Sequence, residues 1–430
     1  RPDLRDGRGE CPPGHHRRDR AERADARASD AWWKNGAVTY FPARVVVDLD
    51  AIAHNVRVLG SLAPTSAVMA VVKADAYGHG LVPVARAAQA GGATWLGTAQ
   101  LDEALTLRAA GVNGRLLTWI FAPGAPLSKA IEADIDLSAG AAWALADIIE
   151  AARSTSIMAR VHLKVDTGLG RGGAFLPEWT AMLHQALEAE AAGVIRVVGV
   201  WSHLASADDV TSPVTNAQLE VFTEAVARAE QAGADLEVRH LANSAATLIN
   251  PAMHADLVRP GIAVYGLSPI PGRSSASFGL VPAMRLEASV MVAKQAGAGQ
   301  GVSYGHTYTT TQATTLADIP LGYADGIPRH ASGRGPVQIA GTRHHVAGRV
   351  CMDQFVVDVG PDSPVRAGDT AVLFGSGAGG EPTAADWAEA AGTIDYEIVT
   401  RIGARVPRSY VGTAGVTSPG DGAPHDANLR

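Results

Sequence analysis

A lysine that closes an apolar run is the first residue whose position suggests chemistry. Lys73 ends the segment AVMAVVK, and Tyr77 follows four positions later. A lysine desolvated at such a place has a lowered pKa, and its neutral amine can form a Schiff base with a carbonyl compound. A strand-end lysine that extends its ammonium group into solvent is the alternative, and Lys73 taken alone favours it.

Two further segments suggest a phosphate site. The segment NSAA (243–246) opens a short helix-like stretch, where Ser244 could cap the helix and donate its hydroxyl to a phosphate. The segment RPGI (259–262) offers backbone N–H groups beside Gly261, which permits close approach. A plain helix cap and a plain bend are the alternatives for each segment alone. Other polar residues that follow apolar runs are Lys164, Asp166, Arg171 and His203.

The elements that would position these residues alternate along the chain between about 65 and 270. Ala-rich stretches of helical spacing separate short apolar runs that read as strands: 67–73, 94–99, 115–120, 134–139, 159–166, 196–204, 237–243 and 257–264. Strands that alternate with helices predict a parallel sheet, and eight of them predict a closed (β/α)8 barrel. In such barrels the active site lies at the carboxyl ends of the strands, and phosphate sites use the loops after strands seven and eight.

The pattern of the sequence changes near residue 281, where apolar and polar residues alternate between Gly-rich turns. This pattern is typical of antiparallel sheets. We therefore expect an α/β chain, with a TIM-type barrel over 44–280 and a mostly antiparallel β domain over 281–410. Within the barrel range, 44–56 could pair with the β domain. Residues 1–43 and 411–430 are expected to be a disordered extension and a flexible tail.

Composition excludes several classes of protein. A net charge of -7 argues against a general nucleic-acid surface, and no apolar run approaches the 18 residues of a membrane span. The two cysteines, Cys11 and Cys351, lack metal-ligand spacing, so we expect no metal site and a cytoplasmic location.

The sequence resembles the bacterial alanine racemases over about 44–410. AVVKADAYGHG (70–80) resembles the cofactor-lysine signature of that family. Further family motifs follow in order: KVDTGLGRGG, WSHLA, HLANSAA, VRPGIAVYG, GVSYGHTY, GYADGIPR, GRVCMDQ and TIDYEIVTRIG. The resemblance implies a pyridoxal 5'-phosphate enzyme that interconverts L-alanine and D-alanine and supplies D-alanine for cell-wall peptidoglycan.

The resemblance also implies which residues react and which bind the cofactor. Lys73 would hold the cofactor as an aldimine and act as one of two acid/base catalysts. Tyr304 of the partner subunit would be the second base, on the opposite face of the substrate, with His203 and Arg259 easing its deprotonation. Arg259 would hydrogen-bond the pyridine nitrogen, and because a guanidinium can only donate, that nitrogen stays unprotonated. The phosphate ligands would be Tyr77, Ser244, Gly261, Ile262 and Tyr396.

The remaining roles implied by the resemblance concern the substrate and the second subunit. Arg171 would bind the substrate carboxylate together with Met352 of the partner subunit, and Lys164, carbamylated in many family members, would position Arg171. Supporting residues near the second base and the access route would be Asp353, Tyr323, Arg329 and Arg349. Because the site would be shared, a C2 homodimer with two equivalent sites is expected.

Three other functions are open at this point. A racemase of broader specificity, acting on serine for example, would differ only in pocket walls, since one methylene gives about 1–3 kcal/mol of discrimination. An amino-acid decarboxylase could have the same barrel-plus-β architecture, although the context of Tyr304 counts against it. A non-catalytic pyridoxal-phosphate carrier would resemble the barrel but lack the second domain.

Overall fold

The computed structural model describes residues 41–209 and 211–416. The expected N-terminal extension lies outside the described residues up to position 40, and the expected tail lies outside them from position 417. Among the helices in the described ranges, none is both long and apolar enough to cross a membrane.

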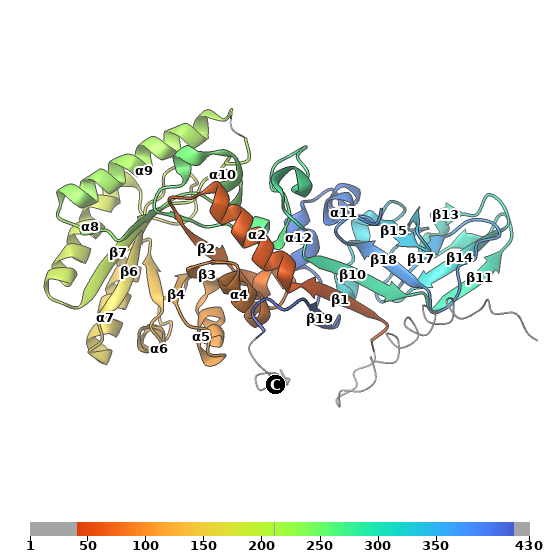
Figure 1. Cartoon of the computed structure of the whole chain (residues 1–430), viewed down its shortest axis with the longest axis horizontal. Helices are drawn as coiled ribbons and strands as arrows, with labels where there is room; N and C mark the ends of the chain where they lie inside the picture. The colour runs from red at the N-terminus through yellow and green to blue at the C-terminus, as the bar shows by residue number, and fades with distance from the viewer. Residues whose placement is uncertain (1–40, 210, 417–430) are drawn as a thin grey trace, which may run out of the picture. The chain divides into compact units, whose positions relative to one another are not determined.

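A ring of eight parallel strands forms the first part of the described chain (Figure 1). The strands are β2 (Ala67–Val71), β3 (Trp95–Gln100), β4 (Arg115–Ile120), β5 (Asp136–Ala139), β6 (Ala159–Lys164), β7 (Ile195–Trp201), β8 (Val238–His240) and β9 (Leu257–Val258). They follow the order β8-β7-β6-β5-β4-β3-β2-β9, and two backbone hydrogen bonds join the ends of this series. Asp256 N donates to Arg239 O at 3.1 Å, and Arg259 N donates to Ala242 O at 2.9 Å. The predicted (β/α)8 barrel is therefore confirmed, as a nearly closed ring.

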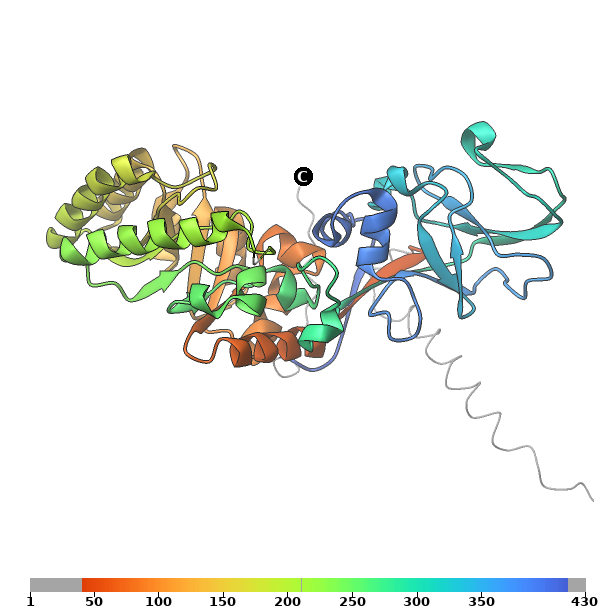
Figure 2. The same ribbon diagram turned by 90° about the horizontal axis from the view of Figure 1, so that it is seen from above.

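Helices cover the outside of this ring. They are α2 (Leu49–Leu62), α4 (Leu81–Ala90), α5 (Leu101–Ala109), α6 (Leu127–Glu132), α7 (Ala142–Thr155), α8 (Leu176–Ala191), α9 (Pro213–Gln231) and α10 (Ser244–Ile249). Helix α9 shows why they lie there, because it buries Phe222, Val226 and Ala229 at helical spacing. Helix α8 packs against both β7 and α9 (Figure 2).

The interior of the ring is filled by apolar side chains from six strands. This cluster consists of Met69, Trp95, Leu117, Val198, Val238 and Leu257. Burying each such side chain contributes roughly 1.5–3 kcal/mol. The packed interior leaves the carboxyl ends of the strands as the place for a cavity.

Mostly antiparallel sheets form the second part of the described chain, as predicted. One sheet has the order β16-β15-β18-β10-β1-β19. Its strands are β1 (Ala43–Asp48), β10 (Met284–Ser289), β15 (Pro336–Ile339), β16 (Thr342–His345), β18 (Thr370–Phe374) and β19 (Arg408–Val411). A second sheet contains β11 (Val292–Ala296), β14 (Thr314–Ile319) and β17 (Phe355–Asp358), and a two-stranded ribbon contains β12 (Gly301–Val302) and β13 (Tyr308–Thr309). Helices α11 (Ala384–Ala391) and α12 (Asp395–Thr400) complete this part.

The first described strand belongs to this second part. Strand β1 pairs antiparallel with β10 and parallel with β19. Its side chains alternate, and Val45 and Val47 are fully buried. After β19 the chain is held against the start of α2, since the Asp50 carboxylate accepts hydrogen bonds from Thr413 N at 2.9 Å and Ala414 N at 2.8 Å.

Candidate active site

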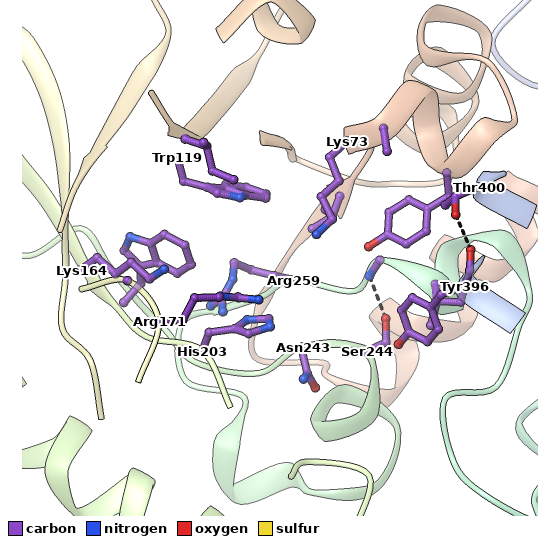
Figure 3. A pocket seen from close by; sticks show the side chains of 18 residues that line it. Lys73, Trp119, Lys164, Arg171, His203, Asn243, Ser244, Arg259, Tyr396 and Thr400 are labelled. Carbon is purple, nitrogen blue, oxygen red and sulfur yellow. Dashed lines mark hydrogen bonds between the residues drawn. The ribbon is translucent and has the colours of Figure 1, made fainter. Parts of the chain in front are cut away.

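A cavity of about 560 Å³ lies at the carboxyl ends of the barrel strands (Figure 3). Most of its lining comes from the strand ends and the loops that follow them, and α12 of the second part adds Tyr396 and Thr400. The structure brings together here the predicted site residues Lys73, Tyr77, Lys164, Arg171, His203, Ser244, Arg259, Gly261, Ile262 and Tyr396.

Lys73 begins a left-handed turn rather than ending a strand. Strand β2 stops at Val71, and residues 74–77 all have φ between 52° and 54° in the short helix α3 (Lys73–Gly78). Each non-glycine residue in that conformation costs roughly 1–2 kcal/mol. The turn is held from outside, because Ala74 N donates to Glu103 Oε1 at 2.5 Å. Burial lowers the pKa of Lys73, Arg171 lowers it further, and Glu103 opposes the shift.

One wall of the cavity is a polar cradle made by two loops. Ser244 Oγ accepts hydrogen bonds from Gly261 N at 2.7 Å and Ala263 N at 3.3 Å, so its own proton remains available to a ligand. The expectation that Ser244 caps α10 is wrong. The cap is Asn243, whose side chain accepts from Ala246 N at 3.1 Å.

Two tyrosines stand beside this cradle. The ring of Tyr77 lies 4.7 Å from that of Tyr265 and 6.2 Å from that of Tyr396. Burial raises the pKa of both Tyr77 and Tyr396 above the ordinary tyrosine value. Both hydroxyls therefore stay protonated and can act as hydrogen-bond donors.

Arg259 forms the floor of the cavity and is only 4% exposed. Its Nη2 donates to Ser202 O at 2.6 Å and Leu241 O at 3.2 Å, and its guanidinium carbon lies 4.9 Å from the Trp201 ring. Burial lowers the pKa of Arg259 to about 9, which still leaves it protonated at neutral pH. The side chain is thus a fixed cation.

Several cationic groups meet in this cavity. The pKa of Lys164 is lowered to about 8, chiefly by burial and also by Arg171 and Arg259, while Asp166 opposes the shift. Burial also lowers the pKa of His203 to about 3, with Arg259 adding to the shift, so this ring is neutral. The loop that carries Arg171 is shaped by Asp166, whose carboxylate accepts from Arg171 N at 2.9 Å. The excess of positive charge suits an anionic ligand.

Apart from Tyr396, the residues expected from the β domain lie outside this cavity in the described part of a single chain. Tyr304 is 70% exposed and Met352 is 53% exposed, and within the described chain neither lines the cavity. Ser303 Oγ donates to Arg349 O at 2.7 Å, and Ala324 N donates to Met352 O at 2.9 Å. These bonds join the segments that carry Tyr304, Arg349 and Met352.

The other residues expected to support the site from the β domain are Tyr323, Asp353 and Arg329. Tyr323 N donates to Cys351 O at 3.0 Å, and Arg405 Nη1 donates to Asp353 Oδ1 at 2.9 Å. Arg329 begins a short 3₁₀ turn before β15. In the described part of a single chain, Tyr323, Asp353 and Arg329 do not line the cavity either.

Sequence reasoning missed some of the lining. Trp119, Ile120 and Thr400 were not singled out, and Trp201 was only part of a quoted motif. The available signal was an aromatic residue near the end of a barrel strand, because Trp201 ends one apolar run and Trp119 is the last residue but one of the predicted strand 115–120. In the described residues, no cluster of three or more His, Cys, Asp or Glu side chains could hold a metal.

Comparison with known proteins agrees with this geometry. The family model for the alanine racemase N-terminal domain matches 47–269, and that for the C-terminal domain matches 283–410. The chain is 67% identical to alanine racemase from Beutenbergia cavernae over 372 residues, which is 86% of this chain and 98% of that protein. It is 58% identical to alanine racemase from Salinispora arenicola over 371 residues, 86% of this chain and 98% of that one.

The chain belongs to the alanine racemase family. A solved structure, alanine racemase from D-cycloserine-producing Streptomyces lavendulae, matches with a TM-score of 0.86 at 55% identity, covering 87% of this chain and 98% of that one. This racemase therefore interconverts L-alanine and D-alanine and uses pyridoxal phosphate.

The cavity of this racemase fits that cofactor. The phosphate is an anion with several acceptor oxygens, and the cradle offers the Ser244 hydroxyl beside protonated tyrosines. The cradle also requires a glycine, because a Cβ at Gly261 would lie 2.3 Å from Tyr77 Oη. A buried cation, Arg259, lies on the floor, and an amine of lowered pKa, Lys73, stands within reach of the same space.

The Gly261→Ala variant is expected to bind pyridoxal phosphate about tenfold more weakly, because overpacking of this kind costs roughly 1–3 kcal/mol. Titration of the apoenzyme with the cofactor measures the dissociation constant. The control is Gly60→Ala in α2, where the added Cβ meets only Val68 Cγ2 at 3.8 Å. Equal affinities for the two variants would contradict the cradle described above.

Proposed function

We propose that this racemase moves the α-proton of alanine between two bases, Lys73 and Tyr304 of the partner subunit. The observation that carries the proposal is the position of Lys73 in the cavity, among titratable side chains that are poor bases. His203, at a pKa of about 3, is too weak a base, and Tyr77 and Tyr396 are held protonated. Lys73 has a lowered pKa, which favours a neutral amine that can accept and return a proton.

When bound, pyridoxal phosphate supplies an electron-withdrawing ring that acidifies the α-proton of the attached amino acid. Lys73 would hold the cofactor and exchange a proton on one face of the substrate. On the opposite face, a protein group must return a proton for the configuration to change. We assign this role to Tyr304, which is exposed on the β domain and available to a second copy of the chain.

A shared site requires a homodimer with C2 symmetry. Large apolar side chains at the barrel mouth support it, since Ile120 is 49% exposed and Phe175 53% exposed. On the β domain, Tyr304 and Met352 are exposed as well. Large apolar side chains exposed beside a site are typical of a face that a partner covers. The β domain of one subunit would close the barrel of the other, giving two equivalent sites.

The other side chains bind and orient. Arg171 and the backbone of Met352 of the partner subunit would hold the substrate carboxylate, and Arg259 would donate to the pyridine nitrogen. His203 would stand beside the second base. The phosphate ligands would be Tyr77, Ser244, Gly261, Ile262 and Tyr396, and residues that support the second base or narrow the access route would be Asp353, Tyr323, Arg329 and Arg349.

The proposed reaction is tested by following α-proton exchange and optical rotation in D2O. L-alanine is expected to lose rotation and to gain deuterium at Cα at comparable rates. Initial rates with L-serine and L-lysine measure substrate breadth, and alanine is expected to be fastest. Release of carbon dioxide would instead indicate a decarboxylase, and cofactor binding without exchange would indicate a carrier.

We also propose that the enzyme supplies D-alanine for peptidoglycan in the cytoplasm. The proposal is supported by the resemblance to the bacterial enzymes and by Cys351, which is a free thiol. A strain that lacks the gene is expected to need added D-alanine for growth. Growth without D-alanine would show that another source is sufficient.

Lys164 is proposed to carry a carbamate that positions Arg171. Carbamates form from the neutral amine, and a pKa of about 8 means that the neutral fraction of Lys164 rises between pH 7 and pH 9. The 13C signal of a carbamate from labelled bicarbonate is therefore expected to grow over this range. The Lys164→Gln variant is expected to lack the signal and to raise KM about tenfold, because Arg171 loses its partner. A signal that persists in Lys164→Gln would assign the carbamate to another lysine.

A further inference from the structure

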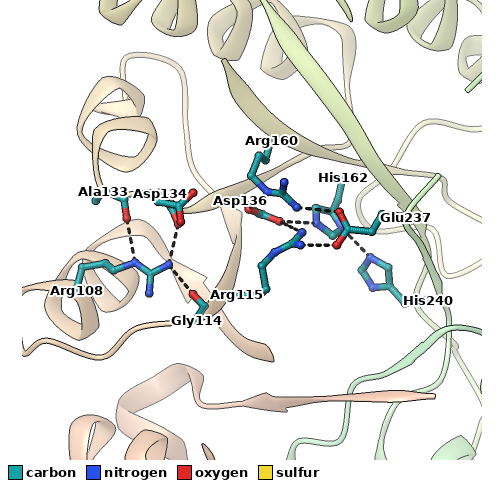
Figure 4. A network of polar contacts seen from close by, with 10 residues as sticks. All are labelled: Arg108, Gly114, Arg115, Ala133, Asp134, Asp136, Arg160, His162, Glu237 and His240. Carbon is teal, nitrogen blue, oxygen red and sulfur yellow. Dashed lines mark hydrogen bonds and ion pairs between the residues drawn. The ribbon is translucent and has the colours of Figure 1, made fainter. Parts of the chain in front are cut away.

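A chain of hydrogen bonds runs through the barrel interior, from Arg259 on the floor of the active site (Figure 3) to Asp136 (Figure 4). Arg259 Nη1 lies 3.2 Å from His240 Nδ1, and His240 Nε2 lies 2.9 Å from His162 Nδ1. His162 Nε2 then lies 3.1 Å from Asp136 Oδ2. Both histidines are fully buried and Asp136 is 1% exposed, so water does not compete for these contacts.

The two ends of this chain dictate where its protons lie. The Arg259 guanidinium can only donate, so His240 Nδ1 must accept and its Nε2 must carry the proton. The Asp136 carboxylate can only accept, so His162 Nε2 must carry the proton and its Nδ1 must accept. The two requirements meet at the contact between the rings, where His240 donates to His162. An added proton on either ring would set two N–H groups against each other.

The rings are held in this arrangement by their surroundings. Trp201 stacks on His240 with an interplanar angle of 1° and a centroid distance of 5.6 Å. Trp95 meets His162 edge-on at 5.5 Å. Gly199 lets β8 lie close to β7 beside the histidine pair, because a Cβ there would lie 2.4 Å from Val238 O and 3.3 Å from His162 Nδ1.

Arg259 is a buried cation whose hydrogen-bond partners in the described chain are uncharged. They are Ser202 O, Leu241 O and the His240 ring. A buried charge is costly unless an opposite charge compensates it. Hydrogen bonds in a chain polarise one another, so a carboxylate at one end strengthens the acceptor at the other.

We propose that Asp136 is a positioning residue of the active site, which acts through the neutral rings of His162 and His240 to hold the Arg259 guanidinium in place. The carboxylate makes His240 Nδ1 a stronger acceptor and so holds the guanidinium in its place on the cavity floor. The inference rests on the proposed role of Arg259 at the cofactor ring. The tautomers of the histidines follow from the contacts alone.

The charged cluster around Asp136, at the far end of the hydrogen-bond chain, offers a matched control. Arg115 and Arg160 both bind Asp136, at 3.0 and 2.9 Å, and both also bind Glu237 (Figure 4). Glu237 is an anion of the same cluster, yet no hydrogen bond connects it to either histidine in the described residues. Glu237→Gln therefore removes a charge from this cluster and leaves the histidine chain intact.

The first test measures the tautomers in the holoenzyme. Long-range 15N–1H NMR at pH 7, with signals assigned by comparison with His162→Gln, is expected to show both rings as neutral Nε2–H forms. Either ring as Nδ1–H, or doubly protonated, would overturn the proposal. This result does not depend on Arg259 contacting the cofactor, so it separates the proposal from the proposed function.

The second test compares Asp136→Asn with Glu237→Gln. Asparagine keeps an acceptor for His162 but loses the charge, so Asp136→Asn is expected to weaken cofactor binding to the apoenzyme about tenfold, as seen for supporting residues around bound groups. Glu237→Gln is expected to change it by less than about twofold. The double variant Asp136→Asn/His162→Phe is expected to bind the cofactor as weakly as His162→Phe alone. The two losses do not add, because the two residues act in series. Equal effects of the two charge removals, or additive losses, would reduce Asp136 to a structural residue.

Discussion

Replacing Lys73 with alanine is expected to lower the rate of alanine racemisation by at least about a thousandfold. The variant loses both the amine that attaches the cofactor and one of the two proposed bases, and a single acid/base group contributes about 10²–10⁴-fold. The rate is measured from D-alanine formed. Borohydride treatment followed by peptide mapping is expected to fix the cofactor on Lys73 in the wild-type enzyme and on no lysine in the variant.

Two further variants make this result specific. Lys73→Arg keeps a positive charge but cannot attach the cofactor, so it is expected to be as inactive as the alanine variant. Lys129→Ala changes an exposed lysine on α6 and is expected to leave the rate unchanged. Racemisation that survived in Lys73→Arg would remove Lys73 from the reaction.

Mixing two inactive variants is expected to restore activity. Tyr304→Phe lacks the second base and Lys73→Ala lacks the first, so each homodimer should be at least about a hundredfold slower than wild type. After subunit exchange at equal amounts, half of the dimers are mixed. Each mixed dimer has one site with both bases intact, so about a quarter of the wild-type activity should return.

The arrangement of the two substitutions provides the control. When both are placed in the same chain and mixed with wild type, every mixed dimer lacks one base in each site, and activity should fall instead of rising. Native mass spectrometry confirms the exchange. If the mixture of single variants stays inactive after exchange, each site is complete within one chain and the proposed role of Tyr304 is wrong.

The barrel was predictable because periodicity is a local property. Each predicted run overlaps a strand, and 115–120 coincides with β4. The prediction for 257–264 is too long, because β9 ends at Val258 and a 3₁₀ turn follows over Ile262–Tyr265. The turn after Lys73 was not predictable, since AVMAVVK continues to favour a strand through the lysine. The left-handed conformation is stabilised by Glu103, which lies 29 residues away, and no local pattern records such a contact.

The residues of the site were likewise predictable only where a local pattern indicates them. Lys73, Arg171 and Arg259 could be found because polar residues at strand ends share one face of a barrel. His162 and His240 were not singled out, because their importance depends on contact between rings 78 residues apart. The cap of α10 was assigned one residue too late, since Asn and Ser are both good caps. The hydrogen bond from Gly261 N to Ser244 Oγ, which only the fold shows, gives Ser244 its other role.

The position of β1 between β10 and β19 has a consequence for how this chain can fold and be cut. Strand β1 cannot pair until β10 and β19, which lie far later in the chain, have been made, and Arg44 meets Glu287 across 243 residues. Loop closure of this length slows folding. A fragment that begins at 283 would lack the strand between β10 and β19, leaving two open edges prone to association. The strand near the start and the strand near the end lie side by side, so the chain could be rejoined there and reopened in a surface loop without removing a strand from the sheet.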